Sequence, residues 1–496
     1  MNRTSSIVLT AAIAALAGGI SAGLVLRGDG ESAPAASRIP QASRAELAAA
    51  GLGNVPVAPA SRRVDLAVPR FSNPTRITNP LFPISNLASA VLSGRVEGKR
   101  FHTETTLLPE TEVIEWPAGH RTETRVSQYV AYLGGRIEEV ALDHYAQADD
   151  GSVWYFGEDV FNYVDGVVAD TEGTWRAGRD GPAAMIMPAH PKVGDVYRSE
   201  NVPGLVFEEV TVKRVRVTVA GPTGPIGGAI IGQELHDDGT REDKTFAPGY
   251  GEFFTGGGGD VEAMALAVPA DGARGPEPDE LRVLSAAGVQ ASRADLPRLT
   301  QAWNAYRSRG VPPRIAHEME GALARLHNGL RAHNHHARAA AAALDVAQSA
   351  LDLSLRYRRP VDVDADRFAL WTRRVGIDAA AHDSSAVKGD VSALEWISQR
   401  FVASLDPVRR ARLTFELRIL RSSAGDDDFR AGNPRRSPSC GAPSLGRLEP
   451  ARDRGGARGR DRLAEHEGPE LVRLPDHRLP LGGKAAAGDE QRGARA

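Results

Sequence analysis

Histidines form the densest group of side chains in this chain that could bind a metal ion. His327, His333, His335 and His336 lie close together in the sequence, and imidazole is a common ligand for zinc and copper. Successive helical residues turn by about 100°, so a helix directs these four side chains to different faces. A single ion therefore cannot be held by all four.

A smaller set could converge on one ion between packed helices. Asp378 and His382 are four residues apart, which places them on one face of a helix together with Trp371 and Val375. With His333 they make a candidate metal site of His333, Asp378 and His382. The competing interpretation makes His333 a polar residue in a helix seam and Asp378 and His382 an ordinary helix pair.

Aromatic and acidic side chains gather in the first half of the chain, where they could line a concave pocket. The candidate ligand-binding residues are Trp154, Phe156, Glu158, Trp175 and His190. Aromatic residues that alternate along a strand also serve as core and cross-strand packing. Both interpretations stay open at this point.

Common catalytic and cofactor motifs do not occur in the sequence: there is no GxxxxGK[ST], HExxH or GxSxG, nor GxGxxG followed by a helix. We therefore assign no catalytic residue, expect no cofactor and favour a protein that is not an enzyme. One enzymatic alternative remains. A hydrolase could use carboxylates such as Glu158 and Asp195 that pair only in the folded chain.

The sequence pattern around the candidate pocket is typical of an antiparallel β domain, which we predict over residues 76–272. Short runs rich in Val, Thr, Tyr and Phe are broken by Gly, Asp and Pro. Val140, Leu142 and His144 alternate within one run, and Asp149-Asp150-Gly151 has the composition of a hairpin turn. We expect a curved sheet or partial barrel.

A helical bundle is predicted over residues 285–424, because the apolar period changes from two to about 3.6. One stripe runs from Met319 to Leu351 at spacings of four and three, which predicts a single long helix. A second helix carries Phe368, and Asp406-Pro407 has the composition of a helix start.

The two ends of the chain differ in composition from both domains. Residues 1–27 contain an apolar run long enough to span a bilayer, which predicts a signal anchor or, alternatively, a cleaved signal peptide. Residues 28–75 are predicted to be a flexible linker. Residues 425–496 are predicted to be a disordered tail or a frame-shifted end. The one cysteine, Cys440, excludes an internal disulfide and lies too far from the leader to carry a lipid.

Charge and length narrow the possible partners. A formal net charge of -3 over 496 residues gives no field that would attract nucleic acid, so we expect no nucleic-acid partner. The leader predicts contact with the cell membrane and export of the remainder. We expect the partner to be a cell-envelope component or a small apolar ligand. The sequence does not indicate an oligomeric state.

Several motifs of the β region resemble a family of secreted or lipid-anchored actinobacterial proteins of unassigned function. They are the runs 144–147, 151–158, 172–175, 187–191, 193–197 and 247–251. The helical runs 343–358 and 367–371 look like a domain found beside signal peptides in similar bacteria. The resemblance implies an exported protein and carries no catalytic residue. The chain departs from the family in lacking the cysteine that would be lipid-modified.

The sequence as a whole favours a multidomain exported envelope protein. It combines an N-terminal anchor or signal helix, an antiparallel β-rich domain and an all-α bundle. We expect it to bind a ligand without catalysis. The alternatives are an extracytoplasmic metal-binding protein that uses the bundle, and the hydrolase described above.

Overall fold

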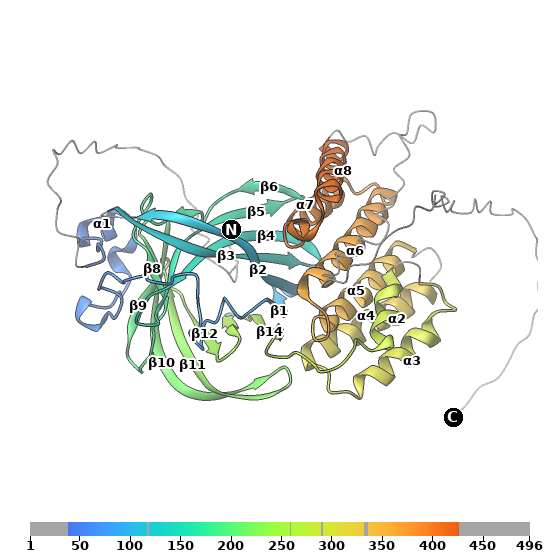
Figure 1. Ribbon diagram of the computed structural model, residues 1–496, viewed down its shortest axis with the longest axis horizontal. Helices are drawn as coiled ribbons and strands as arrows, with labels where there is room; N and C mark the ends of the chain where they lie inside the picture. The colour runs from blue at the N-terminus through green and yellow to red at the C-terminus, as the bar shows by residue number, and fades with distance from the viewer. Residues whose placement is uncertain (1–37, 117–118, 258, 289–290, 332–335, 426–496) are drawn as a thin grey trace, which may run out of the picture. The chain divides into compact units, whose positions relative to one another are not determined.

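The computed structural model describes residues 38–116, 119–257, 259–288, 291–331 and 336–425 (Figure 1). The predicted leader and the segment after Gly425 lie outside the described residues. Among the helices that are described, none combines the length and the apolar character that crossing a membrane requires. The described residues fall within one compact unit.

Fourteen strands form one antiparallel sheet, as the alternation predicted. The order is β6-β5-β4-β3-β2-β1-β14-β13-β12-β11-β10-β9, with β7 and β8 both paired to β5. The strands are β1 (Ser89–Val96), β2 (Lys99–Trp116), β3 (His120–Leu133), β4 (Arg136–Gln147), β5 (Val153–Val164), β6 (Val167–Asp170), β7 (Trp175–Arg176), β8 (Ala184–Met187), β9 (Val196–Val202), β10 (Val206–Gly221), β11 (Gly224–His236), β12 (Arg241–Ala247), β13 (Gly251–Gly257) and β14 (Asp260–Val268).

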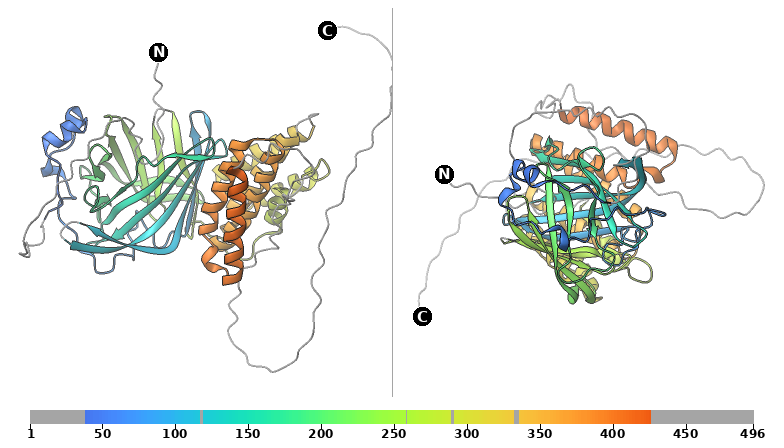
Figure 2. Two further views of the ribbon diagram at one scale, coloured as in Figure 1. Left: turned by 90° about the horizontal axis from the view of Figure 1, so that it is seen from above. Right: turned by 90° about the vertical axis from the view of Figure 1, so that its left-hand side faces the viewer.

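The sheet is curled, so that the half built from β1–β6 faces the half built from β9–β14 (Figure 2). Pairing of β1 with β14 joins the two halves on one side. On the other side β8 pairs with β5 and leads directly along the chain into β9. The inner face of the curled sheet is therefore enclosed from several directions.

Helices follow the sheet in the chain, which confirms the predicted order of a β-rich part and then an α-helical part. They are α2 (Asp279–Ser285), α3 (Leu296–Arg307), α4 (Pro313–Arg331), α5 (His336–Ser354), α6 (Pro360–Ala380), α7 (Ser384–Gln399) and α8 (Pro407–Gly425). A short helix, α1 (Arg44–Ala49), precedes the sheet and begins with a capping box between Ser43 and Glu46.

The prediction of one long helix through Met319 and Leu351 was wrong. The stripe is divided between α4 and α5, which belong to one buried apolar cluster. Gly329 of α4 lies so near Ala339 of α5 that an added Cβ would come within 3.0 Å of the Ala339 backbone. Two shorter helices can pack their stripes against each other, whereas one long helix would need another partner along its whole length.

One outer face of the sheet packs against α6 and α7. Val130, Tyr132 and Val140 share a buried cluster with Trp371 and Val391. The rings of Tyr132 and Trp371 are stacked, with 5.0 Å between their centroids. Strands β3 and β4 are consequently covered by apolar side chains on this face and are enclosed on the other.

A buried ion network also joins β2 to the helices. Glu104 binds the guanidinium groups of Arg367 and Arg400, which are fully buried. Arg367 also lies 2.6 Å from Asp352 and 3.0 Å from Asp364. Because each buried charge has an opposite partner, the network avoids the large penalty of an isolated buried ion.

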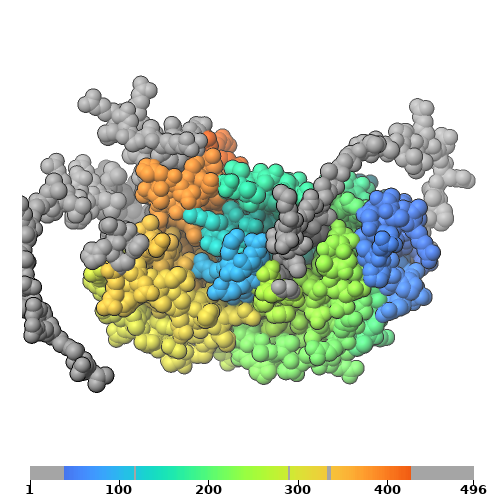
Figure 3. All heavy atoms as spheres, turned by 180° about the vertical axis from the view of Figure 1, so that it is seen from behind, coloured from blue at the N-terminus to red at the C-terminus, as the bar shows by residue number. Residues whose placement is uncertain are grey.

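Residues 38–75 differ from the expected flexible linker. Ile39 and Leu66 are buried, and the Ile39 amide donates to the Leu66 carbonyl at 2.9 Å. Arg63 forms a buried ion pair with Asp65 and a β-bridge with Val196. Figure 3 shows this part of the chain, in blue, against the body of the molecule.

Candidate functional site

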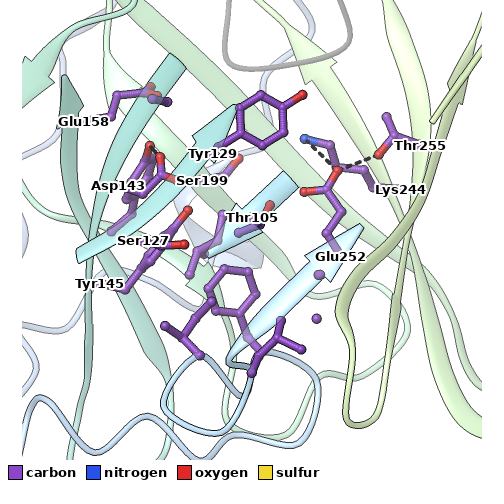
Figure 4. Close-up of a pocket in the computed structure, with 18 of the residues that line it drawn as sticks. Thr105, Ser127, Tyr129, Asp143, Tyr145, Glu158, Ser199, Lys244, Glu252 and Thr255 are labelled. Carbon is purple, nitrogen blue, oxygen red and sulfur yellow. Dashed lines mark hydrogen bonds and ion pairs between the residues drawn. The ribbon is translucent and has the colours of Figure 1, made fainter. Parts of the chain in front are cut away.

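A cavity of about 150 Å³ lies inside the curled sheet. Strands from both halves of the sheet contribute to its walls (Figure 4). Apolar side chains of the segment before β1 and of β1 itself form one part of the lining, with Phe82, Ile84, Leu87, Ala90 and Leu92. Carboxyl groups form another part. They belong to Glu139, Asp143, Glu158, Glu200, Glu208, Glu252 and Glu262.

Strand β4 supplies two of these carboxyl groups through its alternation. Glu139, Ala141, Asp143 and Tyr145 are each two residues apart, so they share the face that lines the cavity. Val140 points to the other face and packs with the helices. The apolar residues that alternate along β4 therefore lie on its outer face. The acidic residues between them lie on its inner face.

A bulge in β5 brings Glu158 onto the same wall. Asp143 pairs with Glu158, whereas Tyr145 pairs with Tyr155, so β5 has one residue more than β4 over this stretch. Tyr155 and Glu158 are three residues apart and would face opposite sides of a regular strand. The extra residue allows both of them to line the cavity.

Like charges face each other across the strands in three places. Asp143 is opposite Glu158, Glu200 is opposite Glu208, and Glu234 is opposite Glu242. All six residues are buried. Carboxylates directly opposite one another destabilise a sheet, and burial increases the penalty. An arrangement that is unfavourable for folding is typical of a functional site.

Protonation relieves part of this repulsion on the β4–β5 wall. Burial raises the pKa of Asp143 to about 7, although the Tyr155 hydroxyl donates a hydrogen bond to its carboxylate at 2.7 Å. Burial, Glu200 and Asp143 hold the pKa of Glu158 well above its ordinary value. Burial and Glu208 raise the pKa of Glu200 likewise. A cation bound beside these groups would favour their ionised forms.

The opposite wall contains Lys244, the one basic side chain among the described residues that line the cavity. Its ammonium lies 2.8 Å from Glu234 and 4.0 Å from Glu252. Figure 4 shows Lys244 and Glu252 across the cavity from Asp143 and Glu158. Burial and Glu252 raise the pKa of Glu262 to about 8. One lysine therefore does not neutralise the acidic lining.

His236 lies behind this wall, between two carboxylates. Nδ1 is 3.4 Å from Glu208 and Nε2 is 3.6 Å from Glu242. Burial acts to lower the pKa of His236, but hydrogen bonds with Glu208 and Glu242 raise it to about 11. Burial likewise opposes the shift at Glu208, whose pKa Lys244 and His236 lower to about 2. Burial and then Glu208 raise the pKa of Glu234 to about 8.

The five predicted ligand-binding residues do not form one site. Glu158 lines the cavity, as that prediction requires. Trp154, Phe156 and Trp175 are buried in the main apolar cluster of the sheet instead. His190 is exposed and does not line the cavity. The aromatic residues support the wall from which Glu158 projects.

The structure describes two of the three predicted metal residues, Asp378 and His382. His333 lies outside the described residues. Asp378 pairs with Arg136 of β4. Helix α6 ends at Ala380, and His382 beyond it has a left-handed φ of 57°. Asp378 and His382 therefore do not share a helical face, because the helix stops before the second residue. Asp195, named for the hydrolase, accepts from the Lys192 amide in a turn.

Searches among family models, curated proteins and solved structures find no match to this chain. The interpretation of the cavity therefore rests on its own residues.

Proposed function

We propose that the curled sheet is a binding module for a small organic cation, an amine with an apolar body. The observation that carries the proposal is the lining of the cavity, in which seven carboxyl groups face one lysine. Ionising these groups together would bury an excess of negative charge, which is costly without a positive partner, and several of their pKa values are accordingly raised. An ammonium group would supply that partner and could donate hydrogen bonds to several carboxylates at once.

The remaining lining suits the apolar body of such a ligand. Phe82, Ile84 and Leu92 offer aliphatic and aromatic contact, and Tyr129 and Tyr145 add aromatic rings to the lining. The volume of about 150 Å³ corresponds to a ligand near the size of benzene. The sequence predicted a cell-envelope component or a small apolar ligand, and the present proposal changes this expectation by adding a positive charge to the ligand.

Export remains part of the proposal, supported by the apolar run within residues 1–27. An exported binding module would meet cell-envelope components, some of which carry free amines. We propose no catalytic step for this function.

Isothermal titration calorimetry tests the proposal with three ligands of one shape: benzylamine, benzyl alcohol and benzoate. We expect benzylamine to bind and the other two to bind at least roughly tenfold more weakly, a difference of about 1.4 kcal/mol. Asp143→Asn and Glu158→Gln should each weaken benzylamine binding, because each removes a carboxylate from the lining. Glu172→Gln, at an exposed position, is the matched control. Equal binding of the amine and the alcohol would contradict the proposal.

A second function is favoured by one specific observation, the juxtaposition of Asp143 and Glu158 with raised pKa values. A protonated carboxyl beside a second one is the arrangement of a general acid with its partner in hydrolases. Screening chromogenic esters and glycosides separates the two functions. Turnover that Asp143→Asn abolishes would support the hydrolase, and its absence across the panel would count against it.

A further inference from the structure

We propose a second site in the sheet, a binding site for a divalent transition-metal ion formed by Glu208, Glu234 and His236. Their candidate ligand atoms lie within 4.8 Å of one another. Two carboxylates and one imidazole form a ligand set suited to zinc, and to manganese, iron or cobalt in the divalent state. Glu208 also lines the cavity, whereas Glu234 and His236 lie outside its lining, and the metal site does not rest on the amine proposed for the cavity.

The strand register holds the ligands on one face. Glu234 and His236 are two residues apart on β11, so their side chains point the same way. Glu208 of β10 is paired directly with His236, and Glu242 of β12 is paired directly with Glu234. The four side chains thus occupy the corners of one patch across three hydrogen-bonded strands, which restricts their movement and preorganises the site.

A second observation points to a missing cation. Glu242 is nine-tenths buried, and its Oε2 has no hydrogen-bond partner among the described residues. The other oxygen of this carboxylate lies 3.6 Å from His236 Nε2. A buried oxygen without a donor is costly. A metal ion bound by His236 would place positive charge beside this carboxylate, either as a fourth ligand or as its electrostatic partner.

The local charge balance also suits a divalent ion. Glu208, Glu234 and Glu242 carry three negative charges when ionised, and Lys244 beside Glu234 carries one positive charge. With a neutral imidazole, as metal binding requires, the patch is left with a net charge of about -2. The His236 side chain is 23% exposed, so an ion can reach it from solvent.

A second cluster of possible metal ligands in the molecule differs from the proposed site in the cations that already occupy it. His102, Glu104 and Asp352 also bring three possible ligand atoms within 4.8 Å of one another. There, however, the rigid guanidinium groups of Arg367 and Arg400 already hold the carboxylates. At the proposed site the competing cations are a lysine on a flexible stem, which can withdraw when the ion enters, and the imidazolium of His236, which can release its proton to the ion's advantage.

Calorimetric titration of the chelator-treated full chain with Zn²⁺ and Mg²⁺ tests the site, and Co²⁺ absorption spectra report the ligand set. We expect Zn²⁺ to bind and Mg²⁺ to bind far more weakly. His236→Gln and Glu208→Gln should each weaken Zn²⁺ binding by roughly tenfold or more and alter the Co²⁺ spectrum. His190→Gln and Glu172→Gln, at exposed positions outside the ligand set, should leave both unchanged.

Far-UV circular dichroism and melting curves establish that each variant is folded. If His236→Gln misfolds, Glu242→Gln serves as the second probe, and we expect it to weaken Zn²⁺ binding. Failure to bind Zn²⁺, or binding that these variants do not change, would overturn the proposal. So would binding lost in His333→Ala or His102→Gln instead. Because benzylamine affinity is measured separately, failure here leaves the proposed function standing.

Discussion

Opposing effects act on the pKa of Asp143. Burial raises its pKa to about 7, and the hydrogen bond from Tyr155 acts in the other direction. Burial and the nearby Glu252 favour the neutral carboxyl, whereas the Tyr155 hydroxyl favours the carboxylate. A ligand that approaches Asp143 meets a group that can be either neutral or negative near physiological pH.

Tyr155→Phe should raise the pKa of Asp143 above its present value, because it removes the donor that stabilises the carboxylate. Carbon-13 NMR titration of the aspartate carboxyls measures this shift. Tyr163→Phe provides a matched control, since the Tyr163 hydroxyl accepts from Trp396 outside the cavity. An unshifted Asp143 in the Tyr155 variant would refute this account of the pair.

Single residues of the site were only partly predictable from the sequence. Glu158 was recognised because it stands among aromatic residues. Glu139 and Asp143 were missed because Val140 and Leu142 drew attention to the other face of the same strand. A usable signal existed, since a strand with acidic residues at alternate positions between buried apolar ones must direct them to a common face.

At the scale of elements, the bulge in β5 determines which side chains of this strand line the cavity. Gly157 within it has a φ of 113°, which non-glycine residues rarely adopt. A Cβ added at this position would lie 2.1 Å from the Trp175 carbonyl oxygen. The close approach of β7 and the inward direction of Glu158 both depend on this glycine.

Gly157→Ala should lower the free energy of unfolding by about 1–3 kcal/mol, the usual cost of such backbone strain. Urea denaturation measures the change. Gly376→Ala is the control, because this glycine of α6 has no atom within 4 Å of an added Cβ. In a helix that substitution should be neutral or stabilise by about 0.5–1 kcal/mol. Equal effects of the two substitutions would disprove the proposed role of Gly157.

Most elements followed from local patterns, and the exceptions have physical causes. The strands were recognisable from alternation and turn residues, whereas the bulge depends on the partner strand and leaves no clear trace in β5 alone. The division of the long helix into α4 and α5 was missed because a continuous apolar stripe is equally compatible with a helical hairpin. Tertiary packing makes that choice.

At the scale of the whole molecule, the buried carboxyl groups should make stability depend on pH. In the folded chain the pKa of Asp143 is about 7 and that of Glu262 about 8, against ordinary values of 3.8 and 4.5. A raised carboxyl pKa means that the folded state binds more protons than the unfolded state. The stabilisation that each of these carboxyl groups gives the folded state is largest below its ordinary pKa. It declines as the pH rises toward the pKa of the group in the folded state.

We therefore expect the contribution of these two carboxyl groups to the free energy of unfolding to fall as the pH rises from about 4 to about 8. Urea denaturation at several pH values measures the slope. Asp143→Asn and Glu262→Gln should each flatten it, because neither amide titrates. Glu110→Gln, at an exposed position of β2, should leave it unchanged. A slope that persists in the double variant would show that other groups are responsible.

The ion network between β2 and the helices has a consequence for the order of folding. Arg400 follows Glu104 in the chain by 296 residues. During synthesis from the N-terminus, β2 thus exists long before the guanidinium group that accompanies its carboxylate. Until α7 and the residue after it, Arg400, have been synthesised, the Glu104 carboxylate is more stable in water than buried under apolar side chains. We therefore expect this face of the sheet to become buried only after the helices that cover it have been synthesised.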